Sequence, residues 1–174
     1  MKHIWLALVV LLLSACSFSA GNAPADHFYR LPDPTQVSVT VAVNIAPVRA
    51  EGIYNERSLL FVEKLYPLEI NRYDYHFWSQ TPSKLVQSYL QSCLTSSDTV
   101  KIPVNTQQAI QLSPMIESFE RVLEKGKAEA VVKLRLNQRV YESRIMADSM
   151  DMHATVAAYG QAMQAICTAI AHDL

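Results

Sequence analysis

The residues whose types and spacing specify chemistry most clearly are Leu13-Ser14-Ala15-Cys16, at the end of an apolar N-terminal run. Lys2 supplies a positive charge before this run, and small residues precede the cysteine. This order is typical of a bacterial lipoprotein signal, in which the Cys16 thiol is acylated and becomes the first mature residue. Two or three acyl chains hold a protein at a membrane durably, whereas one is marginal. The run is shorter than the ~20 residues that span a bilayer, so we expect residues 1–15 to be a cleaved signal peptide.

The residues after Cys16 indicate where the lipid would be held. An aspartate after the cysteine commonly retains lipoproteins in the inner membrane of Gram-negative bacteria, so Ser17 favours the periplasmic face of the outer membrane. An ordinary secretory signal with an incidental cysteine is the alternative. Residues 16–34 contain Ser, Ala, Gly, Asn and three prolines, which predicts a flexible linker. Within it, the apolar patch His27–Leu31 could add an edge strand to the domain.

Composition excludes several classes of function. The 174 residues are 50% hydrophobic, enough for one domain over residues 35–174, and the formal net charge of −1 gives no overall attraction to nucleic acid. The chain holds four glycines, and they are widely separated. Glycine-rich loops that cradle phosphates need clustered glycines, so we expect no nucleotide site of this kind. We expect no other cofactor.

Enzymatic and metal sites have weak support in the sequence. The histidines are scattered and no serine lies in a G-x-S-x-G elbow, so we expect no enzyme; a hydrolase whose Ser, His and acid meet in space is the alternative. Met150, Met152 and His153 form the one stretch with the soft ligands of Cu(I). We favour another interpretation, in which the methionines fill gaps in the core and neighbouring Asp and Ser cap a helix.

Two groups of side chains are candidates for a partner interface. Lys133, Arg135 and Arg139 are expected to form the row opposite the apolar side chains of one strand, where they could dock acidic groups or lipid head groups. We favour a solvated row, neutralised by Glu117 or Glu120 of the neighbouring strand. The second group precedes a helix: Trp78 is assigned to the core, and Tyr73 and Tyr75 to a candidate interface.

Cys93 and Cys167 are the cysteines that remain after Cys16. Both are expected on buried helix faces on the same side of the sheet. In an oxidising periplasm they could form a disulfide, and the alternative is two buried thiols that act as small hydrophobes. Spacing does not decide between these alternatives.

Hydrophobic alternation predicts the strands. Val37, Val39, Val41, Val43 and Ile45 alternate with small or polar residues, which predicts one half-buried strand over residues 36–48. Shorter apolar runs predict further strands, and a long hairpin turns at Glu124-Lys125-Gly126-Lys127. These strands cover residues 59–62, 65–70, 100–104, 115–123 and 128–145.

Apolar residues at spacings of three and four predict two helices. The first begins near Thr81-Pro82, where threonine is a good N-cap and proline favours the first turn. The second is alanine-rich and covers residues 155–171, with Tyr159, Met163 and Ile166 on one stripe. We therefore expect a two-layer α+β domain, with a mostly antiparallel sheet and two amphipathic helices packed on one face.

The ordered features together resemble the ABC-type transport auxiliary lipoproteins over residues 26–174. The resemblance rests on the Leu13–Cys16 motif, His27-Phe28-Tyr29-Arg30-Leu31, Ala46-Pro47-Val48, the segment from Asn71 to Trp78, the late hairpin and the alanine-rich helix before Asp173-Leu174. Trp78 is the most distinctive match. The chain departs from the usual pattern at Gln161, Met163 and Gln164 and at Tyr73-Asp74-Tyr75.

The resemblance implies a non-catalytic, outer-membrane-anchored accessory of a system that moves lipids between membranes. Its partners would be a mammalian-cell-entry (MCE) domain protein and the associated transporter components, and identical copies could form a ring. Two alternatives stay open. One is a lipoprotein that helps to assemble or activate another envelope protein, and the other is an envelope hydrolase.

Overall fold

The computed structural model describes residues 24–96 and 109–174, and its core is a mixed β-sheet. In spatial order this sheet contains β1 (His27–Tyr29), β6 (Ile70–Trp78), β5 (Ser58–Glu63), β9 (Pro114–Glu124), β10 (Lys127–Leu136) and β11 (Arg139–Met146), and β4 (Arg49–Ala50) also pairs with β9. Two short parallel pairs flank it: β2 (Val37–Val39) with β7 (Leu94–Ser96), and β3 (Val43–Ile45) with β8 (Ile110–Leu112). A 3-10 turn, η1 (Gly52–Asn55), precedes β5.

The longest ladders of the sheet are antiparallel, as expected, because short turns join their strands. The β9–β10 hairpin turns at Lys125 and Gly126, whose φ values of 26° and 78° are both positive. Such left-handed turns match the twist of the two strands they join. The pairs β1–β6, β5–β9 and β4–β9 are parallel, which alternation within single strands could not predict.

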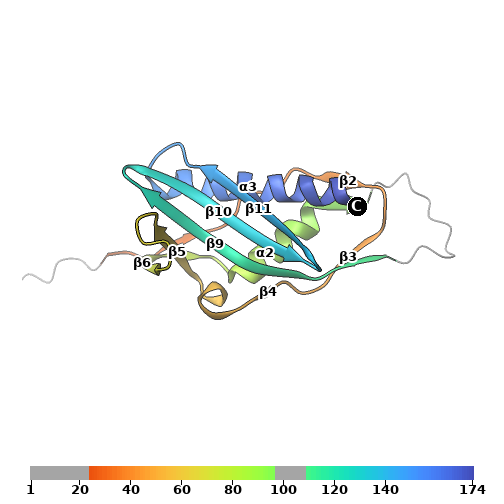
Figure 1. Ribbon diagram of the computed structural model, residues 1–174, viewed down its shortest axis with the longest axis horizontal. Helices are drawn as coiled ribbons and strands as arrows, with labels where there is room; N and C mark the ends of the chain where they lie inside the picture. Colours follow the sequence, from red (N-terminus) through yellow and green to blue (C-terminus); the bar gives the residue numbers. More distant parts are fainter. Residues whose placement is uncertain (1–23, 97–108) are drawn as a thin grey trace, which may run out of the picture.

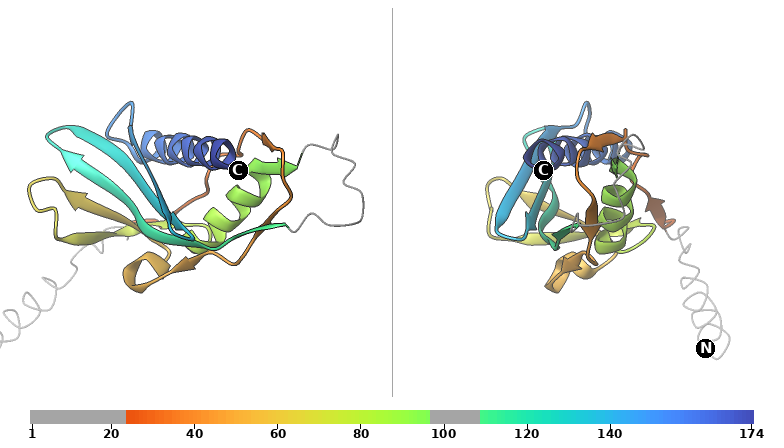
Figure 2. Two further views of the ribbon diagram at one scale, coloured as in Figure 1. Left: turned by 45° about the vertical axis from the view of Figure 1, so that its right-hand side comes forward. Right: turned by 90° about the vertical axis from the view of Figure 1, so that its right-hand side faces the viewer.

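Helices α2 (Pro82–Cys93) and α3 (Met152–Asp173) lie on one side of the sheet (Figures 1 and 2), which confirms the α+β arrangement. Asp151 caps α3, because its carboxylate accepts a hydrogen bond from the Ala154 N–H at 2.8 Å. Thr81 is the N-cap residue of α2, but its hydroxyl contacts Ser83 instead of a backbone N–H. The largest fully buried side chains join both layers in one core; they include Trp78, Phe119, Leu90, Tyr159, Met163 and Ile166.

The single strand predicted over residues 36–48 is wrong. The chain bends at Thr40-Val41, and β2, β3 and the following β4 pair with three different strands. Period-two alternation reports only which side chains are buried, so one pattern can describe several short strands in succession. The strand predicted over residues 100–104 lies outside the described residues.

A turn at Asn137-Gln138 divides the second arm of the predicted hairpin into β10 and β11. Asn137 has a φ of 54°, its Oδ1 accepts from the Ser113 N–H at 3.1 Å, and its Nδ2 donates to the Gln111 carbonyl at 2.9 Å. Asparagine tolerates the left-handed region that this turn requires. The alternation of the predicted strand over residues 128–145 would place Val140 in the core with Leu134 and Leu136, but Val140 pairs with Arg135 and is 44% exposed, so that placement is wrong.

Strand β1 lies within residues 16–34, where a flexible linker with a candidate edge strand was expected. Its apolar patch does form the edge strand, and Tyr29 and Leu31 are buried. In the described ranges, neither α2 nor α3 is both long enough and apolar enough to span a bilayer.

Candidate functional site

The most exposed large apolar side chains of the described residues belong to the loop between β5 and β6. Leu68 is 98% exposed and Leu65 is 77% exposed. The loop satisfies its own backbone: Tyr66 N–H donates to the Glu63 carbonyl at 2.8 Å, and Glu69 N–H donates to the Tyr66 carbonyl at 3.0 Å. These bonds hold the turn in its conformation, so the loop keeps its shape while Leu65 and Leu68 stay exposed to solvent.

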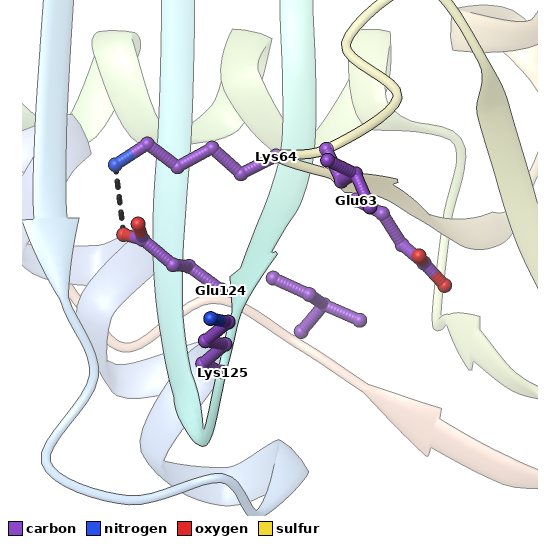
Figure 3. A pocket seen from close by; sticks show the side chains of 6 residues that line it. Glu63, Lys64, Glu124 and Lys125 are labelled. Carbon is purple, nitrogen blue, oxygen red and sulfur yellow. Dashed lines mark hydrogen bonds and ion pairs between the residues drawn. The ribbon is translucent and has the colours of Figure 1, made fainter.

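This loop stands beside the β9–β10 turn. Lys64 N–H donates to the Leu123 carbonyl at 2.9 Å, which extends the parallel pairing of β5 with β9 into the loop. Lys64 Nζ lies 2.7 Å from a carboxylate oxygen of Glu124, as Figure 3 shows, and this hydrogen bond lowers the pKa of Glu124. The two turns enclose an open pocket of about 520 Å³, lined by Glu63, Lys64, Leu65, Leu123, Glu124 and Lys125.

Met146, at the end of β11, lines an adjoining pocket together with Lys64 and is 51% exposed. We call the exposed apolar side chains at this end of the molecule the tip surface: Leu65, Tyr66, Leu68, Ile70 and Met146. A strand was predicted over residues 65–70, and that prediction is wrong for residues 65–69. Pro67 within the run and the charged residues on both sides were the available signal, because proline disfavours a paired strand.

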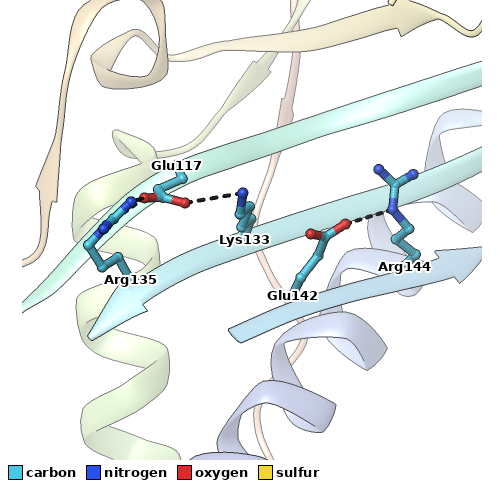
Figure 4. Close-up of polar contacts among 5 residues, drawn as sticks. All are labelled: Glu117, Lys133, Arg135, Glu142 and Arg144. Carbon is cyan, nitrogen blue, oxygen red and sulfur yellow. Dashed lines mark hydrogen bonds and ion pairs between the residues drawn. The ribbon is translucent and has the colours of Figure 1, made fainter. Parts of the chain in front are cut away.

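The basic row is paired within the chain. Glu117 on β9 forms ion pairs with Arg135 and, at 3.3 Å, with Lys133, both on β10 (Figure 4). The hydrogen bond from Arg135, followed by that from Lys133, lowers the pKa of Glu117. The expected neutralisation by Glu117 is confirmed. Lys133 and Arg135 both form ion pairs with this carboxylate of their own sheet.

Arg139 does not share this row, which corrects the expected placement. The turn at Asn137-Gln138 sets Arg139 opposite Leu136 instead of beside Arg135. There Arg139 lies 2.7 Å from Asp173 near the end of α3, and Tyr141 donates a hydrogen bond to the same carboxylate at 2.9 Å. Arg139 therefore ties the β10–β11 end of the sheet to the C-terminal helix.

Tyr73 and Tyr75 differ in their surroundings. The Tyr73 ring packs on Phe61 at 4.7 Å, and its hydroxyl accepts a hydrogen bond from Arg121 at 2.9 Å. Tyr75 is 42% exposed and is the more accessible of the two. Trp78 is 1% exposed, which confirms its assignment to the core.

The residues considered as soft metal ligands do not meet at one point. Met152 is buried at the start of α3, whereas Met150 is 43% exposed and His153 lies on the surface. Within residues 24–96 and 109–174, no three His, Cys, Asp or Glu side chains are placed to hold a metal ion together.

Three histidines that are far apart in the sequence gather around Tyr29. The His27 and His76 rings stack at 5.3 Å, and the Tyr29 hydroxyl lies 3.0 Å from Nδ1 of His76. His153 meets the Tyr29 ring edge-on at 5.7 Å. The parallel pairing of β1 with β6 makes this cluster, so spacing along the chain could not predict it. In the described residues, no serine or cysteine is hydrogen-bonded to these rings.

Cys93 and Cys167 are both fully buried, and their thiols interact as free cysteines between α2 and α3. The hydrogen bond with Cys93, together with burial, raises the pKa of the Cys167 thiol far above its ordinary value. The expected burial of both residues on facing helices is confirmed, and the disulfide stays a prediction. Cys16 lies outside the described residues.

The chain is similar to one protein family in sequence and to solved structures in fold. The family model described as "ABC-type transport auxiliary lipoprotein component" matches residues 29–171. A solved structure described as an uncharacterized protein aligns with a TM-score of 0.62 at 10% identity, covering 86% of this chain and 99% of that chain. Protein XCC0632 from Xanthomonas campestris aligns with a TM-score of 0.57 at 18% identity, covering 83% and 92%. Both similarities concern the fold alone, and no curated protein matches the chain.

Proposed function

Because the chain belongs to the ABC-type transport auxiliary lipoprotein family, we propose that it is the outer-membrane-anchored, non-catalytic accessory of an MCE-type system that moves lipids between membranes. Cys16 would carry the lipid on the periplasmic face of the outer membrane. The folded domain would bind an MCE-domain protein and the associated transporter components, as a ring of identical copies or as a single copy.

The observation that supports a binding role most directly is the division of the exposed surface. Lys133 and Arg135 of the sheet are paired with Glu117, whereas large apolar side chains stand exposed on the β5–β6 loop and at the end of β11. Exposed apolar groups at one place mark surfaces that contact a partner or a membrane. A catalytic site would instead need convergent polar groups with a nucleophile or base.

The partner is tested by crosslinking the tagged protein in the native envelope and identifying the captured proteins by mass spectrometry. The expected result is recovery of an MCE-domain protein with its permease. Recovery of an outer-membrane assembly machine alone would favour the assembly role, and recovery of no envelope protein would contradict both. A variant with Cys16→Ser is the matched control, because it tests whether capture depends on the anchor.

The membrane is tested separately with Ser17→Asp. Sucrose-gradient separation of the two membranes should place the wild-type protein in the outer-membrane fraction and the variant in the inner-membrane fraction. The wild-type protein in the inner membrane would contradict the proposed location, and Cys16→Ser protein that still sediments with membranes would contradict the lipid anchor.

A further inference from the structure

The exposed apolar side chains are concentrated at one end of the molecule. Among the described residues, ten large apolar side chains are exposed, and five of these make up the tip surface. They come from the β5–β6 loop and the end of β11, which lie at the same end as the β9–β10 turn (Figure 1). A surface of this kind binds an apolar partner or enters the interface of a bilayer.

The direction of β1 places the preceding chain at that same end. His27 pairs with His76 and Tyr29 with Trp78 in parallel, so β1 and β6 both run away from the β5–β6 loop. Figure 1 shows the first described residues entering the domain from the end that carries the two hairpin tips. Cys16 precedes Pro24 by eight residues, which span at most about 28 Å when fully extended.

The charges at the tips identify the kind of membrane contact. The two turns carry three lysines and three glutamates, and so no net charge: Lys64, Lys125, Lys127, Glu63, Glu69 and Glu124. A surface held by anionic lipids would need an excess of lysine or arginine. The contact is therefore apolar, and it suits uncharged or zwitterionic phospholipid. Tyr66, 56% exposed, has the amphipathic ring that favours the membrane–water interface.

From this geometry we infer that the tip surface inserts into the interface of the phospholipid bilayer that holds the Cys16 lipid. The inference rests on the proposed lipid anchor, which brings that bilayer within reach. The protein then has two attachments to one membrane: a flexible one through acyl chains and a short, rigid one through the β5–β6 loop. Together they set the orientation of the domain, with the β10–β11 turn and the end of α3 directed away from the bilayer.

The test uses the mature lipidated protein in phosphatidylcholine vesicles and the substitution Tyr66→Trp. Trp5 lies in the expected signal peptide and Trp78 is 1% exposed, so the wild-type protein supplies a constant background that is shielded from the acyl chains and can be subtracted. Emission is compared in vesicles with plain and with brominated acyl chains, whose bromine quenches a nearby indole. The matched control is Val140→Trp. Val140 is 44% exposed and lies near the β10–β11 turn, at the opposite end of the molecule.

The expected result is blue-shifted emission and quenching for Tyr66→Trp but not for Val140→Trp, unchanged when salt is raised. Adding Leu65→Ser and Leu68→Ser to the Tyr66→Trp protein should reduce the quenching while the protein still floats with the vesicles. Floating protein without quenching would overturn the inference and leave the anchor standing. A blue shift without quenching would also overturn it, because protein would then cover the tip. Wild-type protein that fails to float would overturn the anchor and the inference together.

Discussion

Arg121 is a cation buried in the folded domain at 4% exposure. Its guanidinium donates to the Tyr73 hydroxyl and to the Met150 carbonyl, and no carboxylate forms an ion pair with it among the described residues. The bond to Met150 holds the connection between β11 and α3 against the sheet. The Arg121 guanidinium thus holds the β11–α3 loop in place through a hydrogen bond, which explains why a basic side chain occupies an inward position of β9.

We predict that Arg121→Ala lowers the free energy of unfolding by about 2–4 kcal/mol, because it removes two charge-assisted hydrogen bonds and leaves a cavity. Arg72→Ala is the matched control on the same sheet. It removes only the exposed ion pair with Glu56, so it should cost less than about 1 kcal/mol. Urea denaturation measures both values, and equal losses would show that Arg121 has no such structural role.

His76 should make stability depend on pH. Burial chiefly, then the neighbouring His27 and Arg121, lower the pKa of His76 below its ordinary value of 6.5. The unfolded chain therefore binds its proton at a higher pH than the folded protein does. Between the lowered pKa and 6.5 the free energy of unfolding rises with pH, and above 6.5 the contribution is complete.

We therefore predict that His76→Gln flattens the rise in the free energy of unfolding below pH 6.5, measured by urea denaturation from pH 5.5 to 7.5. His172→Gln is the control, because that side chain is 89% exposed at the end of α3. The carboxyl groups of Glu117 and Asp151, whose pKa values are lowered, lose their contribution at more acidic pH. An unchanged pH dependence in His76→Gln would contradict the prediction.

At the scale of elements, Gly160 lets the segment after β1 lie against α3. A Cβ at this position would stand 2.7 Å from Cγ and 2.8 Å from Cδ of Pro32, and a proline ring has little freedom to move. Glycine in a helix costs up to about 1 kcal/mol relative to alanine. The close approach of Pro32 explains why α3 contains glycine at position 160, although glycine disfavours a helix.

We predict that Gly160→Ala destabilises the protein by about 1–3 kcal/mol, the usual cost of overpacking. In a Pro32→Ala background the same substitution should instead stabilise it, because the gain in helix propensity remains and the clash is gone. Thermal denaturation of the four proteins in this double-mutant cycle measures the coupling. The same effect of Gly160→Ala in both backgrounds would show that Pro32 does not cause the clash.

The free thiols of Cys93 and Cys167 meet between the two helices in the buried core. We predict that protein from the periplasm carries a disulfide there, and that it shows no alkylatable thiol when denatured without reductant. In the chain-entropy model a bridge of this span stabilises the fold by ~4–5 kcal/mol. Two alkylated cysteines would contradict the disulfide. The matched control is protein made in the cytoplasm without residues 1–16, in which two thiols should react after unfolding and resist alkylation when folded.

The sequence predicted the elements whose signals are local. Thr81 marked where α2 begins, the Lys125-Gly126 turn marked a hairpin, and the stripe containing Tyr159 marked a buried face, although α3 begins at Met152 and not at the predicted residue 155. Non-local pairing could not be predicted in this way. The division of residues 36–48 between two strands, β2 and β3, depends on partners distant in the chain, and so does the histidine cluster around Tyr29.

The candidate site was only partly predictable for the same reason. Lys133 and Arg135 were placed correctly, together with their partner Glu117, because all three lie on the two strands of one hairpin. Arg139 was misplaced, since Asn137 makes a turn without the glycine that usually signals one. Leu65 and Leu68 looked like strand residues because apolar composition does not distinguish a buried strand from a displayed loop.

For the whole molecule, the inferred membrane contact at the tip leaves the opposite end for the transport partner. That end includes a pocket of about 400 Å³ between the β10–β11 turn and the end of α3, with Leu112, Leu136, Tyr141 and Ile170 among its lining residues. Figure 2 shows the C-terminus at this end, away from the two hairpin tips. A pocket that combines these side chains with Asn137, Arg139 and Asp173 suits a peptide or a lipid chain.

We predict that a photo-crosslinking amino acid at Gln138 captures the protein partner in the native envelope, whereas the same group at Tyr66 captures phospholipid. Gln138 is exposed beside the pocket, and Tyr66 belongs to the tip surface. Immunoblotting for shifted bands and lipid analysis of the adducts separate the two products. Capture of the transport partner from Tyr66 and not from Gln138 would reverse the assigned orientation.

The short strand β1 has a mechanical consequence for a tethered protein. If Cys16 carries the proposed lipid, a pull on that lipid would reach the domain through Pro24 and act along β1, whose three residues pair in parallel with the end of β6. Tension along a strand stretches its hydrogen bonds together in shear, instead of opening them one after another as in peeling. Behind β1, the buried Leu31 and the wedge of Pro32 against α3 resist the same displacement. In the proposed anchored protein, this edge strand would transmit thermal motion of the membrane, or force from a transporting partner, to the core.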